Sequence, residues 1–185
     1  RTRIRRGSGH CPCGPTVRGL DGRGSNLPIN HQNGTIPIEL TVNGREVSLE
    51  IPPQMTLLDL LRDRLSLKGV KRSCDLQVCG ACTILIDGRT ARSCLHFAVA
   101  LDGAVIDTVE GLAGPDELHP IQEAFHRNHA LQCGYCTPGM LIAARDIVTR
   151  LPDADEDRMR VELSGNLCRC TGYVGIVAAI ASVQK

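Results

Sequence analysis

The chain has 185 residues, ten of them cysteine, and a net charge of +1 from 21 Lys and Arg against 20 Asp and Glu. This balance argues against a uniformly basic nucleic-acid-binding protein and against an acidic disordered chain. No run of 18 apolar residues occurs, so the sequence predicts no membrane span. With two Phe, two Tyr and no Trp, the core has to be built from aliphatic side chains.

Residues 1–34 form a basic segment without a hydrophobic period. It holds six arginines and one acidic residue, Asp21, together with Cys11 and Cys13. No apolar stretch follows the first arginines, as an export signal would require. We expect an irregular arm, either a free tail or a strap along a partner subunit. We favour free thiols at Cys11 and Cys13 over ligands shared with a partner, and we expect the protein to be cytoplasmic.

Residues 36–109 predict an α+β unit. Apolar residues alternate with polar or small ones over 36–42 and again over 47–51, and Asn43-Gly44 lies between these runs, which favours a β-hairpin. Thr56 is a good N-cap for a helix that reaches Leu65. A cysteine-rich loop over 69–82 follows, and then strands are predicted at 83–86 and 104–109.

Helical patterns dominate the chain after a Gly- and Pro-containing linker at 111–115, which divides residues 35–110 from 111–185. Helices are predicted over 119–129, 137–150, 154–163 and 173–183. Thr137 is the expected cap of the second helix, with Pro138 following it. Val174, Val177, Ala178 and Ala181 are the expected inner face of the last helix.

Eight cysteines fall into two sets of four. The first set is Cys74-x4-Cys79-x2-Cys82-x11-Cys94. The x4 and x2 spacing is typical of a plant-type [2Fe–2S] ferredoxin loop, which curls around the cluster and directs backbone N–H groups at its sulfides. Gly80 permits close approach in this loop, and the fourth thiolate comes from the next hairpin.

The second set is Cys133-x2-Cys136-x31-Cys168-x1-Cys170, and each of its pairs comes just before a predicted helix. Helix N-termini present free N–H groups and partial positive charge. They would therefore stabilise the anionic, reduced form of a cluster held by four thiolates. Disulfides and structural zinc are less favoured alternatives for both sets. A Rieske centre is unsupported, because no Cys-x2-His accompanies Cys94-x-His96.

Three motifs resemble the iron–sulfur subunit of molybdenum hydroxylases, the xanthine oxidase family that includes aldehyde oxidoreductases and carbon monoxide dehydrogenases. They are Val78-Cys-Gly-Ala-Cys-Thr83, Leu131-Gln-Cys-Gly-Tyr-Cys-Thr-Pro-Gly-Met140 and Gly165-Asn-Leu-Cys-Arg-Cys-Thr-Gly-Tyr173. The resemblance covers about residues 36–183. Many members carry Gly where this chain has Ser73 and Gln77, so the first loop is expected to differ in hydrogen bonding.

The resemblance implies a β-grasp, plant-type ferredoxin-like domain (35–110) followed by a small four-helix bundle (111–185), each with one [2Fe–2S] cluster. It implies a large subunit with a molybdenum–pterin cofactor and a medium subunit with FAD, in a heterotrimer or a dimer of heterotrimers. Electrons would pass from molybdenum to the helical-domain cluster, then to the ferredoxin-like cluster and on to FAD. Gln132 and Cys170 match family positions that lie at the pterin.

The resulting hypothesis is an electron-transfer subunit of a molybdenum-dependent oxidoreductase, with no catalytic residue on this chain. One alternative is a free-standing two-cluster ferredoxin. Another is a redox sensor or a nucleic-acid regulator that uses the arginine arm. Six arginines without interleaved aromatic residues make a weak case for nucleic acid.

Overall fold

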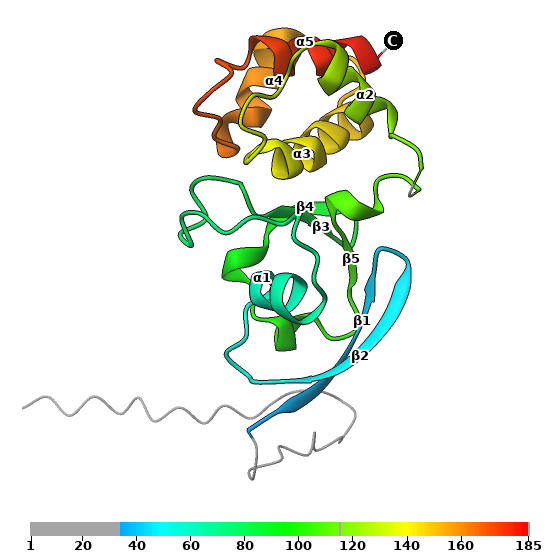
Figure 1. Ribbon diagram of the computed structural model, residues 1–185, viewed down its shortest axis with the longest axis vertical. Helices are drawn as coiled ribbons and strands as arrows, with labels where there is room; N and C mark the ends of the chain where they lie inside the picture. Colours follow the sequence, from blue (N-terminus) through cyan, green and yellow to red (C-terminus); the bar gives the residue numbers. More distant parts are fainter. Residues whose placement is uncertain (1–33, 115, 185) are drawn as a thin grey trace, which may run out of the picture.

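The computed structural model describes residues 34–114 and 116–184 (Figure 1). The arm predicted over residues 1–34, with Cys11 and Cys13, lies outside these residues except for Gly34. The described part is an α+β structure with a five-stranded mixed sheet. The strands are β1 (Ile36–Val42), β2 (Arg45–Ile51), β3 (Thr83–Ile86), β4 (Arg89–Arg92) and β5 (Val105–Asp107).

The sheet has the order β2-β1-β5-β3-β4. β1 and β2 form the predicted antiparallel hairpin, and Asn43 and Gly44 both have positive φ, at 50° and 75°. This is the backbone that a tight hairpin turn requires. β1 pairs in parallel with β5, and β3 pairs antiparallel with both β4 and β5. The last strand of the chain, β5, therefore lies in the middle of the sheet, between β1 and β3.

The predicted first helix is a short one. α1 (Leu57–Asp59) continues directly into a π-helical turn over Leu60–Arg64. The Thr56 hydroxyl oxygen accepts a hydrogen bond from the Asp59 amide at 3.1 Å, which confirms the predicted cap. Four leucines of this segment are fully buried against the sheet, and they share one core with Ile51, Ile84 and Ile106.

Helices make up most of the second half. They are α2 (Pro120–Arg127), α3 (Thr137–Arg150), α4 (Glu156–Glu162) and α5 (Val174–Val183). Two predictions made for these helices are wrong. Cys136 is the N-cap of α3, so Thr137 lies inside the helix. Val174 is 69% exposed and Ala178 is exposed too, because α5 turns Ile176, Val177, Ala179 and Ile180 inward instead.

The two halves pack through β3. Ile84 points into the core beneath α1, whereas its neighbour Leu85 belongs to the core of the helices. α3 packs across β3 and β4, and Figure 1 shows it between the sheet and the other helices. The loops that carry the cysteines are therefore held against one another. In the described part of the chain, no helix is long and apolar enough to cross a bilayer.

Candidate metal centres

The structure gathers Cys74, Cys79, Cys82 and Cys94, the first thiol quartet, around the loop that precedes β3. Cys82 lies just before β3 and Cys94 two residues after β4, so the hairpin pairing of these strands brings the two thiols together. The Ser93 amide and hydroxyl both donate to the Cys82 carbonyl, at 3.2 and 2.9 Å. The fourth thiol thus arrives from the hairpin, as the spacing predicts.

Backbone amides converge on the exposed side of this quartet. The amides of Leu76 and Cys79 both lie 3.4 Å from the Cys74 sulfur, and the Ala81 amide lies 3.5 Å from the Cys79 sulfur. The two bonds to Cys74 lower the pKa of its thiol to about 7. Burial instead raises the pKa of Cys82 to about 11. The loop therefore favours a thiolate at its outer end before any metal binds.

Left-handed backbone shapes this loop. Asp75, Gln77 and Gly80 have φ values of 51°, 62° and 71°. Gln77 occupies one of the two positions where many resembling proteins carry Gly. A side chain in this conformation costs about 1–2 kcal/mol, so glycine would be easier to accommodate there.

Cys133, Cys136, Cys168 and Cys170, the second thiol quartet, lie where the loops before α3 and α5 meet. The Cys133 and Cys170 sulfurs are 3.5 Å apart, and the Cys136 and Cys168 thiols are neighbours. Burial raises the pKa of Cys136 to about 12. For Cys168, burial opposes ionisation, but hydrogen bonds from Thr171 and the backbone outweigh it and lower the pKa.

Side chains of the 166–173 loop fix the second quartet. The Thr171 hydroxyl lies 3.2 Å from the Cys168 sulfur. The Cys168 amide donates to the Tyr173 hydroxyl at 2.8 Å, and that hydroxyl donates to the Asn166 carbonyl at 3.0 Å. Tyr173 has a φ of 68° at the N-cap of α5. Its ring therefore closes the loop on itself just before the helix begins.

The eight thiols, all free of disulfides, suit a binuclear cluster in each quartet. Within residues 34–114 and 116–184, no three His, Cys, Asp or Glu side chains converge as a site for one metal ion. The thiols converge two by two instead. A [2Fe–2S] cluster takes two protein ligands on each iron. Two thiolates on one tetrahedral ion with bonds of about 2.3 Å lie about 3.8 Å apart, close to the separation of Cys133 and Cys170.

A buried hydroxyl supports the same fit at the second quartet. The side-chain oxygen of Thr137, directly after Cys136, is buried and has no hydrogen-bond partner among the described residues. Buried polar groups are normally paired. A sulfur atom of a cluster bound next to Cys136 would be a hydrogen-bond acceptor of the kind that this hydroxyl lacks.

Gln132 and Cys170 lie on one exposed face. Gln132 directly precedes Cys133, whose sulfur contacts that of Cys170, and all three residues are exposed. Large apolar side chains near these residues in the sequence are exposed too: Leu131, Tyr135, Leu167 and Val174 are each at least 40% exposed. The two residues predicted to lie at a pterin are thus brought together at the surface.

Polar contacts that the sequence did not predict join the two quartets. Asn166 is 4% exposed and bonds with groups on three separate segments, among them Arg92 of β4. Tyr135 also donates to the Arg72 carbonyl, two residues before Cys74. These residues lie in loops or on a strand edge, where no hydrophobic period marks them.

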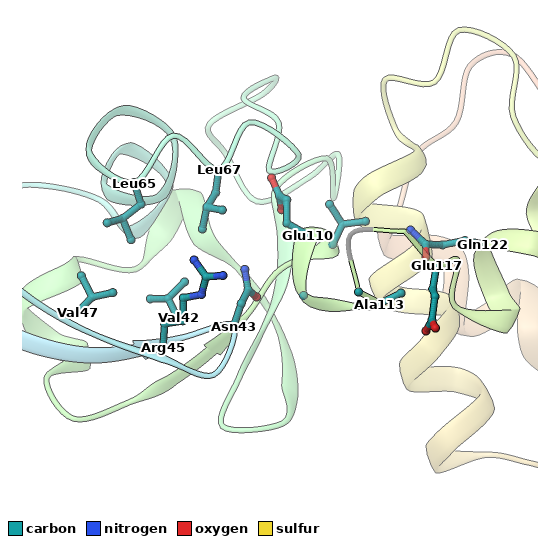
Figure 2. Close-up of a pocket in the computed structure, with 13 residues that line it drawn as sticks. Val42, Asn43, Arg45, Val47, Leu65, Leu67, Glu110, Ala113, Glu117 and Gln122 are labelled. Atoms are coloured by element: carbon teal, nitrogen blue, oxygen red, sulfur yellow. The ribbon is translucent and has the colours of Figure 1, made fainter.

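A cleft of about 810 Å³ lies elsewhere, between the β1–β2 turn and the segment that leads into α2 (Figure 2). Val42, Val47, Leu65 and Leu67 form its apolar wall. No thiol lines it. Glu110 in this cleft already accepts hydrogen bonds from the Gly69 amide and the Thr108 hydroxyl. The cleft is therefore separate from the candidate metal centres.

Comparison with known families identifies both halves. Residues 40–113 match the 2Fe-2S iron-sulfur cluster binding domain, and residues 108–181 match the [2Fe-2S] binding domain. Each match contains one thiol quartet. The plant-type spacing and the paired thiols thus agree with two independent family assignments.

Relatives cover most of the chain. It is 42% identical over 160 residues to the aldehyde oxidoreductase iron-sulfur-binding subunit PaoA of Escherichia coli K12, which spans 78% of this chain and 70% of that subunit. It is 48% identical over 145 residues to the nicotine 6-hydroxylase small subunit of Paenarthrobacter nicotinovorans, which spans 78% and 87%.

A solved structure agrees with this family assignment. A chain of quinoline 2-oxidoreductase from Pseudomonas putida 86 matches with a TM-score of 0.79 and 47% identity, over 82% of this chain and 93% of that one. The sequence resemblance is thus confirmed by domain content, by relatives and by fold. The chain belongs to the family of two-cluster [2Fe–2S] small subunits of molybdenum hydroxylases related to xanthine oxidase.

Proposed function

We propose that this chain is the electron-transfer subunit of a molybdenum-dependent oxidoreductase and relays electrons from a large molybdenum–pterin subunit to a medium FAD subunit. The observation that carries the proposal is the contact between the two thiol loops. The Leu167 amide, next to Cys168, donates to the Cys79 carbonyl at 2.8 Å. Two redox centres held by these loops would be close neighbours, as a relay requires.

Each quartet is proposed to bind one [2Fe–2S] cluster: Cys74, Cys79, Cys82 and Cys94 in the first half, and Cys133, Cys136, Cys168 and Cys170 in the second. When bound, each cluster supplies a carrier for one electron. Hydrogen-bond donors of this chain influence the charge on the ligand sulfurs. The amides at Cys74 and the Thr171 hydroxyl at Cys168 stabilise negative charge on sulfur.

The proposed domains follow the quartets. Residues 35–110 are a β-grasp ferredoxin-like domain, with a mixed sheet that packs on α1. Residues 111–185 are a four-helix domain built from α2 to α5. The basic arm 1–34 precedes both.

The exposed faces suggest how the partners lie. Gln132 and Cys170 would meet the pterin of the large subunit, because an amide offers both donors and acceptors to a pterin edge. The first quartet would face the FAD subunit, and exposed Leu76 and Val78 lie in its loop. The relatives are named as small or iron–sulfur-binding subunits. A cytoplasmic heterotrimer, alone or as a dimer of heterotrimers, follows from the resemblance.

The test is purification of the affinity-tagged chain from its native cell. We expect two further chains, with molybdenum–pterin and FAD in amounts equal to the tagged chain. We also expect the visible absorption of the iron–sulfur clusters to be bleached when a substrate of the complex is added. A monomer with neither cofactor that carries electrons by itself would contradict the proposal and favour a free-standing ferredoxin.

A further inference from the structure

The Asn166 side chain is a buried junction between the two thiol loops. Its amide nitrogen lies 3.1 Å from the Gly80 carbonyl, 3.0 Å from the Thr83 hydroxyl and 3.2 Å from the Gly139 carbonyl. Gly80 lies between Cys79 and Cys82, and Gly139 lies three residues after Cys136. One side chain, two residues before Cys168, thus contacts backbone beside ligands of both quartets.

Arg92 completes the junction from the first half. Its guanidinium donates to the Gly165 carbonyl at 2.8 Å, to the Asn166 side-chain oxygen at 3.1 Å and to the Thr83 hydroxyl at 2.7 Å. Arg92 ends β4, two residues before Cys94. Both ends of the Asn166 amide are therefore bonded, its donors to carbonyl and hydroxyl oxygens and its acceptor to a cation.

Glycines let these backbones approach. A Cβ on Gly80 would lie 2.4 Å from the Gly165 carbonyl oxygen, and one on Gly139 would lie 2.4 Å from the Gly80 carbonyl oxygen. A Cβ on Gly165 would lie 2.6 Å from the Arg92 guanidinium. The junction has no room for another methyl group, so its geometry is fixed by contact as well as by hydrogen bonds.

We infer that Asn166, held by Arg92, is a positioning residue that sets the distance and orientation between the two clusters. These two quantities determine the magnetic coupling between the reduced clusters. The inference rests on the proposed function, which places a cluster in each quartet. Without the Asn166 amide, the Gly80 and Gly139 carbonyls lose a shared donor. The Arg92 contact with Gly165 and the Leu167–Cys79 hydrogen bond would remain between the two loops.

The test uses the intact complex with Asn166→Asp, which keeps the shape and the contact with Arg92 but replaces the donor by an acceptor. Arg92→Lys is the second variant, since it keeps the charge and loses the forked contact. Asn43→Asp is the matched control. Asn43 also bonds through both ends of its amide, to Thr108, at a turn remote from the thiols. Iron content and electron-spin resonance of the reduced protein are measured for each.

We expect the magnetic interaction between the two reduced clusters to weaken in Asn166→Asp and in Arg92→Lys. The splitting of their electron-spin resonance signals and the enhancement of their spin relaxation should both decrease, with iron per chain unchanged. Asn43→Asp should match the wild type. An interaction unchanged in both variants, or two wild-type signals without any interaction, would overturn the inference. A wild-type chain with iron for a single cluster would instead refute the proposed function.

Discussion

The Leu167 amide donates a hydrogen bond to the Cys79 carbonyl at 2.8 Å. Cys79 belongs to the first thiol quartet, and Leu167 directly precedes Cys168 of the second. The loops of the two halves are thus joined through backbone that adjoins proposed ligands on both sides.

Gly80→Ala should destabilise the protein more than Gly88→Ala. Both glycines have positive φ, 71° and 76°, so both substitutions carry the cost of a left-handed alanine. Only at Gly80 does the added Cβ meet backbone, whereas at Gly88 nothing lies within 4 Å. We expect an additional loss of about 1–3 kcal/mol at Gly80, measured by denaturant unfolding. Equal losses would show that the loops can separate without cost.

Thr171→Val should lower the reduction potential of the second cluster on the order of tens of millivolts, because hydrogen bonds to ligand sulfur stabilise the reduced state. The Thr171 hydroxyl lies 3.2 Å from the Cys168 sulfur. Thr171→Ser keeps that hydroxyl and should keep the potential. A spectroscopic redox titration of the three proteins measures both effects. The same potential in wild type and Thr171→Val would contradict the assigned role.

Cys170→Ala should remove the second cluster and leave the first. We expect iron to fall from about four to about two atoms per chain, with one spin signal remaining. Reduction of FAD by substrate in the assembled complex should stop. Cys74→Ala is the reciprocal variant and should leave the other signal. Normal turnover in Cys170→Ala would refute the proposed order of electron transfer.

Glu162→Gln should lower stability at pH 7 by about 1 kcal/mol, or about 2–4 °C in thermal midpoint. Glu162 pairs with Arg150 and Arg158, each at 2.6 Å, and the Arg150 hydrogen bond leads in lowering the pKa of this carboxyl. A lowered pKa stabilises the fold above the unfolded pKa of about 4.3. That stabilisation is lost as the pH falls through the folded value.

The difference between Glu162→Gln and wild type should therefore hold from pH 8 to about pH 5 and shrink toward pH 4. Glu156→Gln is the control. Its partner Arg160 is 3.6 Å away and its side chain is 67% exposed, so little change is expected. A difference that grows on acidification would have the wrong sign for this account.

Local patterns predicted the elements that position the first quartet. Alternating residues around Asn43-Gly44 predicted the β1–β2 hairpin, and Thr56 caps α1 as expected. The spacing of Cys74, Cys79 and Cys82 predicted a loop that curls around a cluster with amides directed at its sulfides; in the structure, amides of this loop lie next to the Cys74 and Cys79 sulfurs. These features depend on neighbouring residues, so the sequence alone carries enough information to identify them.

Other features depend on packing that a local pattern does not encode. α5 is apolar nearly all round, so its period could not identify the buried face, and Val174 and Ala178 are exposed. Cys136 and Thr137 are both able to begin α3, and the structure selects Cys136. The junction of Asn166 with Arg92 joins residues far apart in the chain. Single polar residues in a loop or at a strand end give no signal of such a partner.

The most direct test of the central claim is the iron content of the purified wild-type chain together with its electron-spin resonance after reduction. Two [2Fe–2S] clusters predict about four irons per chain and two distinct rhombic signals. Both signals should depend on the thiols assigned here, one on Cys74 and the other on Cys170. A single signal, or zinc in place of iron with no visible absorption, would contradict the account.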